Sequence, residues 1–89
     1  MKSHTIERFW KLFAALPADV RKQAYKAYDL FSRDPFHPSL NFKEVNKRYG
    51  IWSARINDDY RVLGYRKDGE MRWFWVGSHA DYDKLISRH

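Results

Sequence analysis

The chain is short and basic, with 89 residues, a net charge of +6 and a pI near 9.7. The absence of cysteine excludes a disulfide scaffold and a Cys-based metal site. No apolar run approaches the ~20 residues that span a bilayer, and the N-terminal residues lack the apolar stretch of a signal peptide, which argues against a membrane protein. We therefore expect one cytoplasmic domain over residues 1–89 that does not span a membrane. The positive charge predicts attraction to an anionic partner such as nucleic acid, a ribosome, a lipid surface or an acidic protein, and of these a membrane is not expected. The alternative interpretation is a solvated basic surface without a specific partner.

Two helices are predicted in the N-terminal part of the chain. Apolar residues recur at helical spacing over residues 5–15 and again over residues 18–33, with charged residues between them. Pro17 separates the two segments, because proline is accepted at the start of a helix but not in its interior. The Asp34-Pro35 pair ends the second helix, since a residue before proline avoids the helical region. The two apolar stripes predict an α-hairpin that packs on another layer.

Short segments rich in β-branched and aromatic residues follow, separated by turn signals. The turns at 58–59 and 68–69 make consecutive segments antiparallel hairpins, since Asp-Gly is a strong two-residue hairpin signal. Residues 79–87 are expected to form a helical turn or two, and any strand before the first helix would be limited to residues 2–5. The predicted fold class is α+β, with the N-terminal α-hairpin packed on a small antiparallel four-stranded sheet and a short C-terminal helix. The four expected strands cover residues 41–46, 51–57, 60–67 and 70–77.

Alternation within the last strand assigns its aromatic side chains to the faces of the sheet. Strict alternation places Trp73 and Trp75 on one face, and Phe74 and Val76 on the other. Aromatic side chains beside arginines are typical of RNA contact, because bases stack on both. They also occur as core or as an interface with another chain, and for Trp73 and Trp75 core or partner interface is the favoured interpretation.

His79 is the residue best suited to chemistry, because it follows the last predicted strand and imidazole titrates near neutrality. In ribose-assisted cleavage the 2′-hydroxyl attacks the adjacent phosphate and the 5′-oxygen leaves, which requires a base, an acid and cations. His79, Tyr82, Arg61 and Arg55 could supply these functions without a metal. The alternative interpretation is a histidine at a helix N-terminus that makes a structural hydrogen bond.

No metal or phosphate-loop pattern is present in the sequence. It contains no HExxH motif, no His/Cys pair at ligand spacing and no glycine-rich phosphate loop. The adjacent acids Asp58 and Asp59 could attract a divalent ion, but such pairs in a hairpin turn are far more often solvated turn residues. We therefore expect no cofactor and no metal.

Four segments carry a family resemblance across nearly the whole chain: LPADVRKQAYKAY, DPFHPSLNFKEVN, WSARINDDYRVLGYR and WFWVGSHADYDKLI. In this order they resemble the RelE/ParE superfamily of type II toxins, and the Tyr-Arg pair at 60–61 and the VGSHADY stretch match best. The His-Ala-Asp sequence is most similar to the branch that includes YafQ. Members of that branch use a histidine after the last strand to cleave mRNA on the ribosome.

The resemblance implies roles for individual residues. His79 matches the catalytic histidine of that branch, and Arg61 matches the arginine that contacts the scissile phosphate in RelE-type nucleases. Tyr82 lies near the position of a C-terminal aromatic residue that stacks on or polarises the substrate. Two departures stand against this: RelE itself has an arginine where His79 stands, and the YafQ branch has more histidines in mid-chain. The residues expected to bind nucleic acid are Arg55, Lys43, Lys47 and Arg48.

The expected function is that of the toxin of a type II toxin-antitoxin system, namely a ribosome-dependent and metal-independent mRNA endonuclease that arrests translation. Its expected partners are mRNA on the ribosome and an acidic, partly disordered antitoxin that covers the basic surface. Two alternatives remain open at this point, because one fold can carry several activities. The chain could inhibit DNA gyrase, as ParE members do, or it could be an inactive member that only binds an antitoxin.

Overall fold

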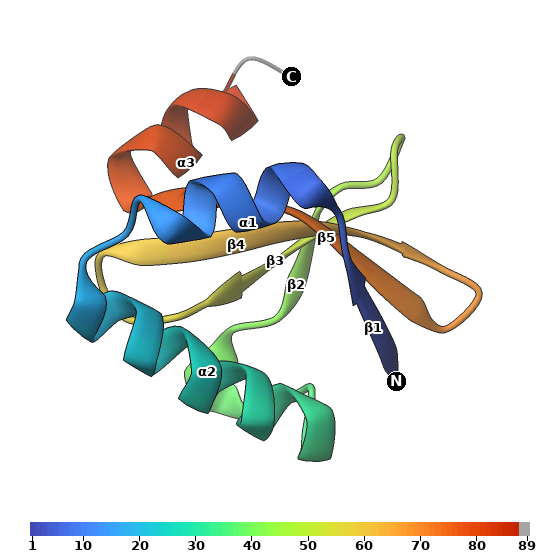
Figure 1. Cartoon of the computed structure of the whole chain (residues 1–89). Coiled ribbons are helices and arrows are strands. Elements are labelled where there is room, and N and C mark those ends of the chain that lie inside the picture. The colour runs from blue at the N-terminus through green and yellow to red at the C-terminus, as the bar shows by residue number, and fades with distance from the viewer. Residues whose placement is uncertain (88–89) are drawn as a thin grey trace.

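The computed structural model describes residues 1–87 and shows one mixed sheet with helices on both faces (Figure 1). The helices are α1 (Glu7–Ala14), α2 (Ala18–Arg33) and α3 (His79–Ser87), with a short 3-10 helix, η1 (Pro38–Leu40). The strands are β1 (Lys2–Thr5), β2 (Lys43–Asn46), β3 (Ile51–Arg55), β4 (Tyr60–Lys67) and β5 (Glu70–Ser78). The α+β class, the bounds of α2 and the bounds of β4 agree with the sequence prediction.

The sheet of the described residues has five strands in the order β1-β5-β4-β3-β2, so the predicted count of four was one too low. The four C-terminal strands form the expected antiparallel meander. The fifth strand is β1, which has the bounds 2–5 expected for a short strand before the first helix and pairs in parallel with β5 over Lys2↔Glu70 to Thr5↔Trp73. A four-residue strand is too short for a clear alternating pattern, and it is stabilised by a partner almost seventy residues away.

Two predicted strands are shorter in the structure than in the sequence analysis. β2 begins at Lys43, because Asn41 closes η1 in the left-handed region at φ 45°. β3 ends at Arg55, because the Asn57 side chain accepts the backbone N–H groups of Asp59 and Tyr60 and so builds the turn before β4. In both places a local side-chain or backbone preference ends the ladder.

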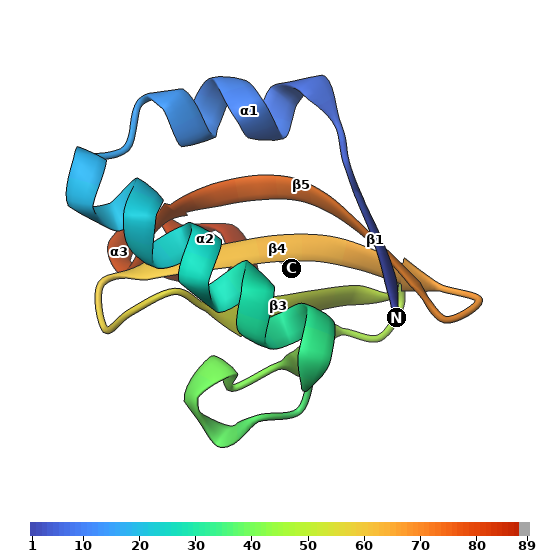
Figure 2. The same cartoon turned by 60° about the horizontal axis from the view of Figure 1, so that its bottom comes forward.

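Helices α1 and α2 cover one face of the sheet and build the larger core. Phe9 and Phe13 of α1 and Phe31 of α2 are buried with Trp73 and Ala54 of the sheet. Phe31 contacts Trp73 edge to face, with ring centroids 5.4 Å apart. Figure 2 shows α2 crossing in front of β3 and β4, with α3 behind the sheet. The predicted packing of the helix pair on one sheet face is confirmed.

Helix α3 builds a second, smaller core on the opposite face. Tyr82 of α3 is buried there with Leu63 of β4 and Trp75 of β5. Leu85 and Ile86, one turn further along α3, pack against this group. The sheet is therefore covered on both faces, and α3 is the short C-terminal helix expected over residues 79–87.

The face predicted for Trp75 was wrong, because β5 contains a β-bulge. Leu63 pairs with Trp75 and Gly64 pairs with Trp73, so Phe74 has no partner on β4. An extra residue reverses the alternation from that point onward. Trp73 therefore faces α1 and α2, whereas Trp75 faces α3. Both tryptophans are buried, in agreement with the core interpretation.

Candidate active site

His79 lies where β5 ends and α3 begins, and both elements fix its backbone. Its N–H donates to the Asp59 carbonyl at 2.6 Å, which extends the β4–β5 ladder by one position. On the helix side, the Ser78 hydroxyl accepts the Asp81 N–H at 3.2 Å and so caps the first turn of α3. The imidazole itself is about half exposed, at 48%. The backbone is therefore held while the ring remains accessible.

Arg61 is the cationic neighbour of His79 on the adjacent strand. It pairs with Gly77, two residues before His79, so Arg61 and His79 occupy diagonal positions on the same face of the sheet. Diagonal neighbours of an antiparallel pair lie about 7–8 Å apart, within reach of a long side chain. The Arg61 guanidinium donates to the carbonyls of Asn57 and Tyr60, the latter at 3.0 Å. These bonds restrict its rotamers near the end of β5.

A second arginine, Arg55, pairs directly with Arg61 across β3 and β4. Two like charges at this position repel each other, and Asp58 at the tip of the hairpin supplies the counter-charge through an ion pair with Arg55. The hydrogen bond from Arg55, its charge and then the charge of Arg61 hold the pKa of Asp58 below its ordinary value of 3.8. The Asp58-Asp59 turn thus neutralises part of an arginine pair.

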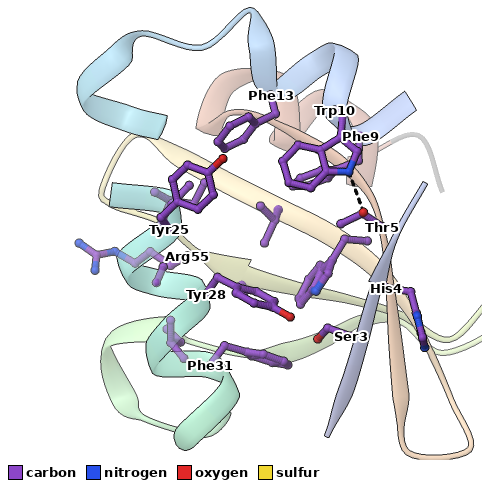
Figure 3. A pocket seen from close by; sticks show the side chains of 17 residues that line it. Ser3, His4, Thr5, Phe9, Trp10, Phe13, Tyr25, Tyr28, Phe31 and Arg55 are labelled. Atoms are coloured by element: carbon purple, nitrogen blue, oxygen red, sulfur yellow. Dashed lines mark hydrogen bonds between the residues drawn. The ribbon is translucent and has the colours of Figure 1, made fainter. Parts of the chain in front are cut away.

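The Arg55 guanidinium already makes contacts within the protein, which leaves it less available to nucleic acid. Besides Asp58, its guanidinium donates to the Ser39 carbonyl of η1 at 3.2 Å. In Figure 3 it points away from the cavity under α1 and α2. The structure therefore brings Arg55 next to Arg61, but two of its contacts are already made within the protein.

The structure does not support the predicted catalytic role of Tyr82. Its side chain is only 5% exposed, and its hydroxyl donates to the Ser53 Oγ atom at 3.3 Å in the interior. Its ring lies nearly parallel to that of His79, with centroids 5.9 Å apart and planes at 23°. Tyr82 faces the core because residues three and four positions apart share one side of a helix, and here they are Tyr82, Leu85 and Ile86.

The three lysine and arginine residues predicted from the β2 region separate into two places. Lys43 pairs with Ser53, whose side chain faces α3, so Lys43 lies on the same face as Arg61 at the exposed edge of the sheet. Lys47 and Arg48 lie in the turn before Ile51, at the other end of β3 from Arg55. Four residues of strand separate those ends by about 14 Å. Lys47 and Arg48 are thus not part of the cluster around His79.

Sequence analysis missed the residue that contacts the imidazole, Asp83. The His79 Nε2 atom lies 3.3 Å from the Asp83 Oδ2 atom, an i, i+4 pair on α3. The spacing of His and Asp in HADYD was the available signal, because residues four apart face each other only if the segment is a helix. Across residues 1–87, no group of three or more His, Asp or Glu side chains is placed to hold a metal ion.

A cavity of about 460 Å³ lies away from His79, between α1, α2 and the sheet (Figure 3). Its walls are mainly aromatic and aliphatic, and the Trp10 indole N–H donates to the Thr5 hydroxyl at its rim, at 2.7 Å. Tyr25 and Tyr28 of α2 border it and are 59% and 49% exposed. Its apolar lining suits apolar groups and not a phosphate backbone, so the candidate site for nucleic acid is the His79 end of the sheet. In addition, no helix of the described residues is long and apolar enough to cross a bilayer.

Solved structures of bacterial and archaeal toxins share the fold of this chain. YafQ from E. coli BL21(DE3) has a TM-score of 0.69 at 15% identity, covering 91% of this chain and 96% of YafQ. The RelB-RelE antitoxin-toxin complex from Methanococcus jannaschii gives 0.73 at 12% identity, covering 92% and 96%. The RelBE2 complex from Mycobacterium tuberculosis gives 0.68 at 20% identity, covering 88% and 96%. The fold is therefore that of the RelE-like toxins of toxin-antitoxin systems.

The family assignment comes from the sequence. Residues 18–84 match the ParE-like toxin domain family, which is most of the chain. The chain belongs to this family, and the RelE/ParE resemblance noted from its motifs is confirmed. A search of curated proteins found no matching sequence.

Proposed function

We propose that this chain is the toxin of a type II toxin-antitoxin system and that it cleaves mRNA on the ribosome without a metal. The observation that carries this proposal is the diagonal placement of His79 and Arg61 in the register of β4 and β5, with a half-exposed imidazole on His79 and a guanidinium on Arg61 that main-chain carbonyls hold in place. A gyrase inhibitor needs neither a titratable group nor a phosphate contact at this position.

The chemistry follows from these two residues. His79 takes the proton of the ribose 2′-hydroxyl as its oxygen bonds to the adjacent phosphorus. Arg61 stabilises the charge that develops on the phosphate oxygens, because it is held in place before the reaction. The bond from phosphorus to the 5′-oxygen then breaks, and that oxygen takes a proton from water. The products are a 2′,3′-cyclic phosphate and a 5′-hydroxyl end. Tyr82 is given no role in proton transfer.

The partner that would neutralise this activity is an acidic, partly disordered antitoxin. The net charge of +6 attracts an acidic chain. Solved relatives include the RelB-RelE and RelBE2 complexes, in which a toxin of this fold is bound to its antitoxin. A disordered segment that folds on binding can cover a large part of a small basic domain.

The test is a cleavage assay on mRNA loaded in ribosomes, with the wild type and the His79→Gln variant. Glutamine keeps a polar side chain of similar reach but cannot titrate, so cleavage should fall by roughly 10²–10⁴-fold, the usual contribution of general acid–base catalysis. Arg33→Ala is the matched control, because Arg33 pairs with Asp29 on the exposed side of α2 and should have no effect. Full cleavage by His79→Gln would refute the assignment. Gyrase inhibition with a DNA-damage response, in the absence of mRNA cleavage, would establish the ParE-like alternative.

A further inference from the structure

The imidazole of His79 is held on two sides by residues of its own helix. Asp83 Oδ2 lies 3.3 Å from His79 Nε2, and the ring of Tyr82 lies against the imidazole at 5.9 Å with planes 23° apart. Tyr82 is itself anchored, because it is buried and its hydroxyl donates to the Ser53 Oγ atom on β3. The ring of His79 therefore rests on a side chain that the sheet fixes.

This arrangement distinguishes the two ring nitrogens. The Asp83 carboxylate lies at ion-pair distance from Nε2, 3.3 Å away, so its negative charge favours a proton on that nitrogen over one on Nδ1. A neutral imidazole therefore carries its proton on Nε2, and its lone pair is left on Nδ1. With the proton favoured on Nε2 by the nearby Asp83 carboxylate, Nδ1 is the nitrogen available to accept a proton from a substrate.

We propose that Asp83 is a positioning residue that sets this tautomer and thereby makes Nδ1 of His79 the atom that takes the proton. The inference rests on the proposed function of the site. When the proton is taken, a positive imidazolium forms on the same face as Arg61, which repels it, while Asp83 offsets that repulsion from α3. The other nearby acid, Asp59, accepts the His79 N–H through its backbone carbonyl and not through its carboxylate. The carboxylate in contact with the ring is therefore that of Asp83 on α3.

The first measurement is the tautomer of His79, observed by ¹⁵N NMR of the imidazole in histidine-labelled chain made by cell-free synthesis, above the pH at which imidazole is protonated. The expected result is a protonated Nε2 in the wild type. In Asp83→Leu a second population with a protonated Nδ1 should appear. In Asp83→Glu, whose carboxylate can still reach one helical turn back, the single tautomer should return. Protonation of Nδ1 in the wild type would overturn the proposal.

The second measurement is single-turnover and steady-state cleavage by the same variants. Asp83→Leu should lower kcat about twofold to fivefold, the range of an exposed ion pair, with KM unchanged because Asp83 is proposed to act only on the imidazole. Asp81→Leu is the matched control. The Asp81→Leu variant loses the same charge from the same helix. Asp81 lies two residues after His79, and residues two apart do not face each other on a helix, so its side chain does not contact the imidazole. A kcat for Asp83→Leu equal to that of Asp81→Leu would also overturn the proposal.

The two measurements separate this inference from the proposed function. If the wild type does not cleave RNA, the proposed function fails, and with it the catalytic part of the inference. The NMR result would still decide whether Asp83 fixes the tautomer, because it needs no substrate. If the wild type cleaves RNA and neither the tautomer nor kcat depends on Asp83, the proposed function stands and this inference alone is refuted.

Discussion

Replacing Tyr82 with phenylalanine separates the role predicted from the sequence from the role indicated by the structure. A catalytic phenol would be lost in Tyr82→Phe, and cleavage would fall by about 10²–10⁴-fold. A buried phenol that only anchors α3 would cost stability and leave the chemistry nearly intact. Because the ring is 5% exposed and its hydroxyl is bonded to Ser53, we expect the second outcome.

The expected loss of stability follows from one buried hydrogen bond. The O···O distance of 3.3 Å is longer than the usual 2.7–2.8 Å, so the bond is a weak one and its removal should cost about 0.5–1 kcal/mol. For a domain of this size that lowers Tm by about 2–8 °C. The aromatic ring remains in Tyr82→Phe, so the contacts with Leu63 and Trp75 are kept.

The assay is thermal unfolding together with mRNA cleavage at a temperature where both proteins are folded. Cleavage by Tyr82→Phe should stay within about threefold of the wild type. Adding Ser53→Ala removes the hydroxyl that was left without a donor, so the double variant should be less destabilised than the sum of the two single variants. Tyr65→Phe is the matched control, because Tyr65 is 45% exposed and stacks on Phe74 through its ring. A hundredfold loss of cleavage at unchanged stability would refute this reasoning.

Two further predictions concern charges at opposite ends of the sheet. Arg55 lowers the pKa of Asp58 below 3.8, so the Asp58–Arg55 pair stabilises the fold above that pH, and this stabilisation is lost as pH falls through the lowered pKa. The Tm difference between wild type and Asp58→Asn should therefore shrink as pH is reduced below about 5. A Tm difference that stays constant over that range would contradict this prediction. Changing Lys47 and Arg48 together to alanine should weaken RNA binding and reduce the slope of log binding constant against log salt concentration by up to about 2. The cleavage rate of bound RNA should not change, because both residues lie far from His79. Binding measured over a salt series, with single-turnover rates as the control, would test this, and a reduced rate would count against the separation.

The parts of the fold that were predictable from the sequence have local causes. Helix α2 runs over the expected residues because Pro17 and Asp34-Pro35 act on their immediate neighbours. The hairpin between β4 and β5 follows from Asp68 and Gly69, which adopt φ of 54° and 76°, the left-handed conformation that such a turn requires.

The parts that were missed depend on contacts between distant segments. The pairing of β1 with β5 joins residues 2–5 to residues 70–73. The residue pattern of a four-residue strand does not identify the strand with which it pairs. The burial of Tyr82 depends on Ser53, which lies 29 residues earlier on β3. In the candidate site, His79 and Arg61 were predicted because their types and positions suit the chemistry, and the register of β4 and β5 places them at diagonal positions. Asp83 was missed although the helix expected over residues 79–87 already places it four residues after His79, on the same side of that helix.

The bulge at Phe74 has a consequence for the comparison of this chain with its relatives. At 12–20% identity over the whole chain, few identical residues are available to set the register of the last strand in an alignment. An aligned relative whose strand lacks the extra residue would match Trp75 to a side chain on the opposite face if no gap were allowed. A one-residue gap placed at Phe74 restores the match of inward-facing and outward-facing positions. It also sets the position to which His79 corresponds, so catalytic residues can be transferred between family members only after that gap is placed.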